Sequence, residues 1–186
     1  MHDIPLYDVN NVISSDEVID DLASVIDSGW LTLGEWTERF EREFSLAHDT
    51  NSGIAMNSCT SALYAALRTL GVRTGDTVVV PAMTFSATAN VVRLLGAKVI
   101  LCDVNDNGNM DPRILKDILS EYEVAAVIPV HLYGLPCDMR EIVEIAREHD
   151  VNVIEDCAHA PGATLDGQPV GSFGDIVVSV STRQRI

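Results

Sequence analysis

The feature that most constrains the fold is a regular alternation of short apolar runs with segments of helical periodicity. Apolar runs indicate buried strands, and apolar residues three or four positions apart indicate amphipathic helices. A strand, helix, strand, helix order predicts an α/β fold, with a right-handed, mostly parallel sheet flanked by helices and loops gathered at one edge. The runs predicted as strands are 53–56, 77–81, 97–103, 124–130, 151–156 and 176–180.

The first 50 residues follow a different pattern. Apolar residues at helical spacing predict a helix over 15–28, and Gly34 leads into a second one. On this second helix Trp36, Phe40 and Phe44 recur at four-residue steps, and such a stripe is typical of core packing. We therefore divide the chain into N-terminal helices, 1–50, and an α/β sheet core, 51–186.

Composition and charge exclude several classes of protein. A chain of 186 residues with 47% hydrophobic content can bury one sizeable core. A net charge of −16 disfavours nucleic acid and anionic membrane surfaces as partners. Cys59, Cys102, Cys137 and Cys157 have no short paired spacing, as expected of reduced thiols. Since no apolar stretch approaches the roughly 18 residues of a membrane span, we expect a soluble, cytoplasmic protein.

The end of the run at 151–156 carries the most informative polar residues. The strand stops at Glu155 and Asp156, and Cys157 and His159 follow. Ligands of open α/β sheets bind beyond the carboxyl ends of the strands. A carboxylate and an imidazole three residues apart suit a cofactor with a ring nitrogen to keep protonated and a ring oxygen to hold. The pattern outlines a site for pyridoxal phosphate (PLP).

A second segment could hold the phosphate group of such a cofactor. Small and hydroxylated residues at 57–61 precede a helix that Gly71 ends. A turn of this kind points backbone N–H groups and the positive end of the helix dipole at one place. The segment alone fits an ordinary serine or threonine helix cap better.

Each candidate also has a purely structural interpretation. Without further support, Asp156 reads as a turn cap, His159 as a surface histidine and Phe85 as a core residue. A metal site built from Glu155, Asp156, Cys157 and His159 is disfavoured because neighbours along a strand point to opposite faces. A dinucleotide site lacks the glycine-rich turn that it requires.

Several longer motifs together resemble a known family. The chain is similar to the N-terminal half of the DegT/DnrJ/EryC1/StrS sugar aminotransferases, which are fold type I PLP-dependent enzymes. The resemblance implies that residues 1–186 form an incomplete PLP-binding large domain and that the small C-terminal domain is absent. The motifs that carry it are GWLTLGEWTERFEREFS, AMNSCTSALYAALRTLGV, GDTVVVPAMTFSATAN, GAKVILCDVN, PVHLYGLPCDM, VNVIEDCAHAPGA and VGSFGDIVV.

The resemblance assigns roles to individual residues. Cys59 and Thr60 match the turn whose amides and hydroxyl hold the cofactor phosphate. Phe85 matches the aromatic residue that stacks on the pyridine ring. Asp156 matches the carboxylate that faces the pyridine nitrogen and keeps it protonated. His159 falls where the family has glutamine or histidine beside the ring hydroxyl.

The last stretch matches less well. Ser179 corresponds to the serine that completes the phosphate site. The family lysine that forms the Schiff base with the cofactor would fall at Gln184 or Arg185. Lys98 and Lys116, the two lysines of the sequence, lie before a strand and within a helix, far from the end of the Asp156 strand. We therefore assign no catalytic residue and expect no transamination by the usual route.

Three functions remain open from the sequence. The resemblance favours a truncated nucleotide-sugar aminotransferase of polysaccharide biosynthesis, a homodimer that moves an amino group from a glutamate-like donor to a nucleotide-linked keto-sugar. Its cofactor would be PLP, or pyridoxamine 5'-phosphate (PMP) in the aminated form. The alternatives are a non-catalytic binding or partner subunit, and a relative of the lysine-less PMP-dependent sugar dehydratases.

Overall fold

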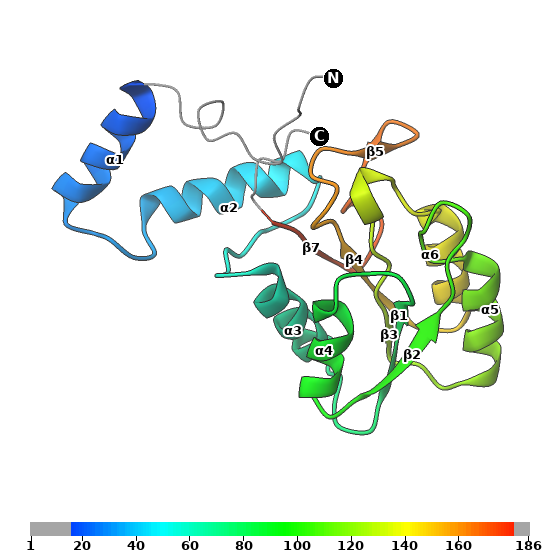
Figure 1. The fold of residues 1–186 in the computed structure, drawn as a ribbon. Helices are drawn as coiled ribbons and strands as arrows, with labels where there is room; N and C mark the ends of the chain where they lie inside the picture. Colours follow the sequence, from blue (N-terminus) through cyan, green and yellow to red (C-terminus); the bar gives the residue numbers. More distant parts are fainter. Residues whose placement is uncertain (1–15, 181–186) are drawn as a thin grey trace, which may run out of the picture.

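A parallel β-sheet forms the centre of the protein. The computed structural model describes residues 16–180, and within them five parallel strands lie in the order β2-β1-β3-β4-β7 (Figure 1). This arrangement confirms the predicted α/β class and mostly parallel sheet. The strands are β1 (Thr77–Pro81), β2 (Lys98–Cys102), β3 (Ala126–Val127), β4 (Asn152–Asp156) and β7 (Ile176–Val178).

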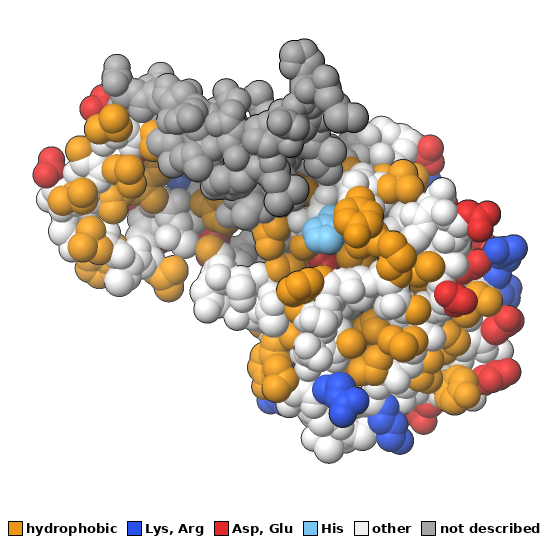
Figure 2. Space-filling view, in the orientation of Figure 1, with side chains coloured by type: hydrophobic (Ala, Val, Ile, Leu, Met, Phe, Trp, Pro, Cys, Tyr) orange, Lys and Arg blue, Asp and Glu red, His pale blue; other side chains and the backbone are white. Residues whose placement is uncertain are grey.

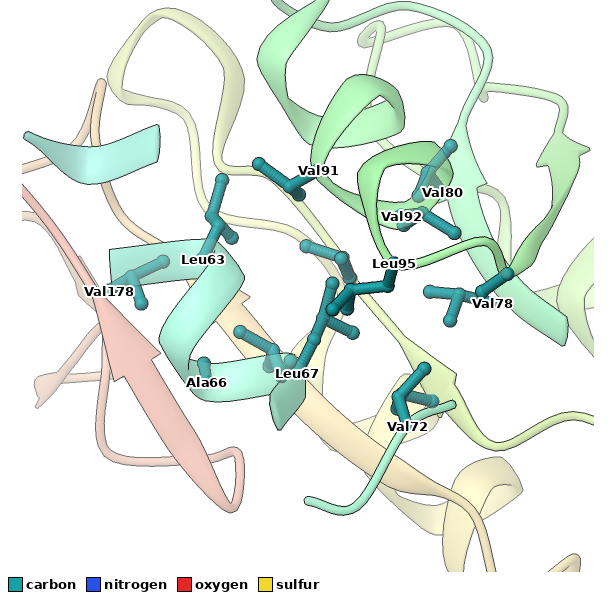
Figure 3. Packing of buried hydrophobic residues seen from close by; sticks show 14 residues of the cluster. Leu63, Ala66, Leu67, Val72, Val78, Val80, Val91, Val92, Leu95 and Val178 are labelled. Carbon is teal, nitrogen blue, oxygen red and sulfur yellow. The ribbon is translucent and has the colours of Figure 1, made fainter. Parts of the chain in front are cut away.

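Helices cover both faces of the sheet, with α3 and α4 on one side and α5 and α6 on the other (Figure 1). Figure 3 shows Leu63 and Leu67 of α3 packed with Val91 and Val92 of α4 in one hydrophobic cluster with side chains of the sheet, such as Val78 and Val178. Burial is nearly continuous along β1, β3 and β4 because both faces are covered there, which explains their uninterrupted apolar runs. The edge strand β2 is less buried and leaves Leu101 60% exposed. The helices are α3 (Cys59–Thr69), α4 (Ala87–Leu94), α5 (Pro112–Glu121) and α6 (Met139–Glu148).

Local sequence signals define several element boundaries. The Ser58 side chain caps α3 by accepting a hydrogen bond from the Ser61 N–H at 3.1 Å. Asp111 caps α5, and Pro112 occupies its first turn. A small antiparallel hairpin, β5 (Thr164–Leu165) and β6 (Gln168–Pro169), turns at the Asp-Gly pair 166–167, a pair that favours such turns.

Two predicted strands differ from the structure. Residues 53–56 form no strand: Ile54 is 84% exposed, and the Ala55 N–H donates to the Glu41 carboxylate instead of to a neighbouring strand. The run at 124–130 forms a strand only at Ala126–Val127, followed by a single bridge between Val130 and Asp156. Apolar composition marked both segments correctly as hydrophobic, but it could not show whether partner strands run alongside them.

The N-terminal helices form an arm that projects away from the sheet (Figure 1). The arm consists of α1 (Asp16–Ser28) and α2 (Glu35–Ala47), close to the predicted boundaries. Core packing was the wrong prediction for Trp36 and Phe40 of the aromatic stripe on α2, which are 39% and 40% exposed, whereas Phe44 is half-buried against His48. Hydrophobic side chains lie open along the arm in Figure 2. On α1 they are Ile19, Leu22 and Ile26.

The described helices are too short or too polar to cross a lipid bilayer.

Candidate functional site

The candidate site lies at the carboxyl edge of the sheet, where β4 ends at Asp156. Asp156 is 4% exposed, and its Oδ1 accepts hydrogen bonds from the Ala158 N–H at 3.0 Å and the Cys59 thiol at 3.8 Å. Within residues 16–180 no hydrogen bond reaches Oδ2. The turn-cap role of Asp156 therefore occupies one oxygen and leaves the other for a ligand.

Burial controls the ionisation of this carboxyl. Removal from water disfavours the charged form and raises the pKa of Asp156, although the hydrogen bond from Ala158 and the field of His159 act in the opposite direction. A cation placed at the carboxylate would offset the cost of burial. A positively charged group bound beside Asp156 would therefore favour its ionised form.

Two neighbouring elements bring the phosphate candidates to the same place. Cys59 begins α3 and contacts Asp156, and Thr60 follows it on an exposed turn. Within the described chain no residue accepts a hydrogen bond from the Cys59 or Thr60 amide, so these two N–H groups point out of the helix unpaired. Ser179 directly follows β7, which pairs with β4, and its hydroxyl donates to the Cys157 carbonyl at 3.3 Å.

The last two candidates differ in exposure. Phe85 lies in the loop between β1 and α4 with 69% of its side chain exposed, so its interpretation as a core residue is wrong. His159 is half-buried rather than a free surface residue. Its Nδ1 is fully buried and has no hydrogen-bond partner among the described residues, so a polar atom at the site lacks its usual partner.

Behind Asp156 lies a buried network that the sequence did not reveal. Glu155 is completely buried, and its carboxylate accepts hydrogen bonds from the His131 ring and from three backbone N–H groups. Those N–H groups belong to Gly171, Phe173 and Gly174, at 2.5, 3.1 and 3.1 Å. The carboxylate thus holds the loop that leads into β7 against the end of β4.

The hydrogen bonds determine which tautomer His131 adopts. His131 Nδ1 accepts from the Cys137 N–H at 2.9 Å, so the proton of the neutral ring lies on Nε2, which donates to Glu155 at 2.9 Å. Burial alone would raise the pKa of Glu155, but the bonds from His131 and Gly171 outweigh it and hold that pKa below its ordinary value. Glu155 is therefore a structural anion.

His131 and Glu155, together with Cys157, are spaced like the ligands of a metal ion, but their bonding does not suit one. Ligand atoms of His131, Glu155 and Cys157 lie within 4.8 Å of one another. However, both histidine nitrogens are occupied, and the carboxylate oxygens already accept four hydrogen bonds. Burial also raises the pKa of the Cys157 thiol and keeps it protonated. His131 and Glu155 are better explained as a hydrogen-bonded clamp, with Cys157 as a buried thiol beside it.

A signal for this network exists in the sequence. Side chains alternate along a strand, so of two adjacent acids at the end of β4 only one can face the cofactor side. The other acid must point to the opposite face of the sheet, where its buried carboxylate needs hydrogen-bond donors. The GSFGD stretch, rich in unhindered N–H groups, and the histidine after the 124–130 run are the natural sources.

The fold and site define a protein class, and the sequence identifies the family. A parallel α/β sheet whose carboxyl edge carries a helix N-terminus and a buried aspartate belongs to the class of α/β proteins that bind ligands beyond the strand ends. The sequence matches the DegT/DnrJ/EryC1/StrS aminotransferase family over residues 13–181, and the chain belongs to this family.

Individual relatives agree with this assignment. A UDP-N-acetyl-3-dehydro-alpha-D-glucosamine 3-aminotransferase from Acidithiobacillus ferrooxidans is 39% identical over 93% of this chain and 47% of its own length. The spore coat polysaccharide biosynthesis protein SpsC of Bacillus subtilis is 38% identical over 86% of this chain and 41% of its own. The chain therefore spans about half the length of the curated relatives it matches.

Solved structures show the same fold. A DegT DnrJ EryC1 StrS aminotransferase from Brucella abortus superposes with a TM-score of 0.89 at 30% identity, over 95% of this chain and 50% of that one. A putative sugar aminotransferase from Streptococcus pneumoniae, solved in a PLP form, gives 0.84 at 32% identity over 95% and 48%. The sheet and its helices are therefore those of PLP-dependent aminotransferases.

The clamp predicts how stability depends on pH. In the variant Glu155→Gln, an amide NH2 group replaces one oxygen that accepts hydrogen bonds, so it faces N–H donors that it cannot accept from. We therefore expect the free energy of unfolding at pH 7 to fall by about 3 kcal/mol. Because folding lowers the pKa of Glu155, its contribution is present above the ordinary value of 4.5 and is lost as the pH falls through the folded value. The difference from the wild type should therefore shrink in acid. Urea unfolding at a series of pH values measures it.

The matched control is Glu148→Gln, since the Glu148 side chain is 54% exposed and only 4.0 Å from Lys116. This control should change the free energy of unfolding by less than about 0.5 kcal/mol. Equal stability of Glu155→Gln and wild type at pH 7, or a difference that grows in acid, would contradict the clamp.

Proposed function

We propose that this chain carries the cofactor-binding half of a PLP-dependent nucleotide-sugar aminotransferase, within an incomplete large domain at 1–186. The observation that carries the proposal is the convergence of Asp156, the unpaired amides at the start of α3 and the unpartnered His159 Nδ1 at one edge of the sheet. A ring nitrogen, a phosphate and a ring hydroxyl are the three groups that these atoms match. They are also the polar groups of PLP.

Each residue has a task in holding the cofactor. Asp156 keeps the ring nitrogen protonated through its buried charge, and His159 pairs with the ring hydroxyl through Nδ1. The amides of Cys59 and Thr60 hold the phosphate. When bound, PLP accepts the electrons released at the substrate carbon and so allows an amino group to move between molecules.

Two further residues complete the proposed site. Phe85 offers its exposed ring to one face of the pyridine, where it orients the ring and excludes water. Ser179 supplies a hydroxyl to the phosphate from the end of β7, next to Asp156 in the sheet. Neither is held in a closed pocket of the described residues, so both remain accessible to a ligand.

The substrate class follows from the relatives. Besides the UDP-sugar aminotransferase, a GDP-perosamine synthase from Caulobacter vibrioides is 38% identical over 94% of this chain. We propose a nucleotide-linked keto-sugar as amino acceptor, a glutamate-like amino acid as donor, a role in polysaccharide biosynthesis and a cytoplasmic location. A protein with a net charge of −16 does not attract anionic substrates by its overall field, so a nucleotide-linked sugar would be held by specific local contacts.

The lysines bear on how the cofactor is held. Lys98 begins β2, so it lies at the edge of the sheet opposite to the end of β4. Lys116 lies on α5 beside Glu148. The candidate positions Gln184 and Arg185 are outside the described residues. We propose that this chain holds PLP without a Schiff base.

Asp156→Asn tests the cofactor proposal. It removes the charge but keeps an acceptor for the Ala158 N–H, so the fold should persist. We expect PMP, a form of the cofactor that needs no Schiff base, to bind about 10- to 100-fold more weakly, as measured by isothermal titration calorimetry. Asp175→Asn is the control, because its carboxylate contacts Val153 at the opposite end of β4. Unchanged PMP affinity in Asp156→Asn would refute the role of Asp156.

The same variant gives a stability signature. Folding raises the pKa of Asp156, so its contribution to stability is full below the ordinary pKa and is lost as the pH rises through the folded value. At neutral pH the ligand-free variant Asp156→Asn should therefore unfold at the same temperature as the wild type or higher. Large destabilisation would instead assign Asp156 a structural role.

Borohydride reduction tests the absence of a Schiff base. After incubation with PLP and reduction, mass spectrometry of peptides should find no stoichiometric adduct, because neither lysine adjoins the site. Lys98→Arg and Lys116→Arg should bind PLP as the wild type does. A stoichiometric adduct on either lysine would overturn this expectation.

The exposed arm supports a homodimer. Ile19, Leu22 and Ile26 of α1 are 64, 58 and 68% exposed and recur at helical spacing, which gives a continuous apolar face. Such a face on a soluble protein marks an interface. We propose that a second copy covers it.

Light scattering after size exclusion measures the oligomeric state. The wild type should have about twice the monomer mass of 20.2 kDa, and the double variant Leu22→Asp/Ile26→Asp should be monomeric. Leu94→Asp, at a residue that is 72% exposed on α4, should remain dimeric. A wild-type monomer would contradict the proposal.

A further inference from the structure

Tyr133 has an unusual backbone conformation. Its φ and ψ angles are 54° and 28°, in the left-handed region, and Gly134 follows at φ 85°. The other residues of the described chain with positive φ that are not glycine are Asp49, Asp150 and Asp166. Aspartate tolerates this region because its short polar side chain can hydrogen-bond locally, whereas tyrosine gains no such compensation. The conformation of Tyr133 is therefore strained.

The surrounding residues impose this conformation. Asn109 is 2% exposed and grips the segment on both sides of Tyr133. Its Oδ1 accepts from the Leu132 N–H at 3.1 Å, and its Nδ2 donates to the carbonyls of Leu135 and Pro136 at 3.0 and 3.1 Å. Because three buried hydrogen bonds fix the flanks, the backbone between them has little freedom. Strain that is fixed in this way is concentrated at functional sites.

The strained backbone places the tyrosine ring on His159. The two rings are stacked with centroids 5.9 Å apart and planes 16° from parallel. Tyr133 remains 74% exposed, so burial of its ring does not explain why the conformation is maintained. The ring lies nearly parallel to the imidazole, whose Nδ1 has no hydrogen-bond partner among the described residues.

We propose that Tyr133 is a positioning residue of the cofactor site, whose strained backbone holds its ring against His159 and so aims Nδ1 at the ligand. This role rests on the proposed function, since the ligand of His159 is the cofactor ring hydroxyl. It adds a residue from the 132–134 turn to a site otherwise built from α3, the loop between β1 and α4, and the ends of β4 and β7. The phenol hydroxyl has no part in this role, so phenylalanine should replace tyrosine.

The test separates binding from stability. In Tyr133→Gly, glycine accepts the left-handed backbone but lacks the ring, so the melting temperature of the ligand-free protein should not fall. PMP affinity, measured by calorimetry on the full chain, should fall roughly three- to tenfold, as expected for the loss of one aromatic stack. Tyr133→Phe should restore wild-type affinity. Asp150→Gly, the same backbone change distant from the site, should leave affinity unchanged.

A second readout needs no ligand. The imidazole C–H resonances of His159, assigned through His159→Gln, should shift in Tyr133→Gly and stay near their wild-type positions in Tyr133→Phe. Unchanged PMP affinity or unmoved His159 resonances in Tyr133→Gly would overturn the proposal. Failure of the wild type to bind PMP, with the resonances still shifting, would overturn the cofactor function while leaving the contact between the rings established.

Discussion

The buried carboxylate of Glu155 is the interaction on which the carboxyl edge of the sheet depends. It joins the end of β4, the residues after β3 and the loop before β7 through one side chain. β3 and β7 are short strands, with two and three residues, so their own backbone ladders hold them weakly. Side-chain hydrogen bonds supply the missing connection. Gly171 must be glycine there, because φ is 91° and a Cβ would lie 2.8 Å from His48 and from Val177.

Two adjacent acids on β4 have opposite tasks because a strand alternates its faces. Glu155 points with Val153 toward the layer of α5 and α6, where N–H donors surround it. Asp156 points with Ile154 toward α3 and meets the Cys59 thiol. Donors lower the pKa of Glu155 in spite of burial, whereas burial raises that of Asp156. The first charge is satisfied within the fold, and the second is available for a ligand.

Sequence patterns predicted the fold where a signal was local and the elements were regular. The order of helices and strands, the cap at Ser58 and the hairpin turn at Asp166 all follow from short-range chemistry. The segment 53–56 and the stripe on α2 were misread because burial depends on neighbours that are distant in sequence. An apolar residue shows that it prefers contact, but not which surface supplies that contact.

In the site, as in the fold, only the residues with a local sequence signal could be predicted. Asp156 and His159 could be located because they follow a strand end. The pair of acids there also indicated that one of them needs donors from the opposite layer, but it could not show which groups supply them. Nothing local marked Asn109 or Tyr133, since their importance comes from hydrogen bonds and a backbone angle. Glu155 and Asn109 support the site from behind, and Tyr133 is one of the groups that they help to hold. Hydrogen-bonded groups behind the site hold less favourable groups in front of it. These are a buried acid and an imidazole, each with one atom that is unpaired among residues 16–180, and a tyrosine with a strained backbone. A fold that tolerates such groups together must fix them strongly from behind, and the clamp of Glu155 and the grip of Asn109 provide that support.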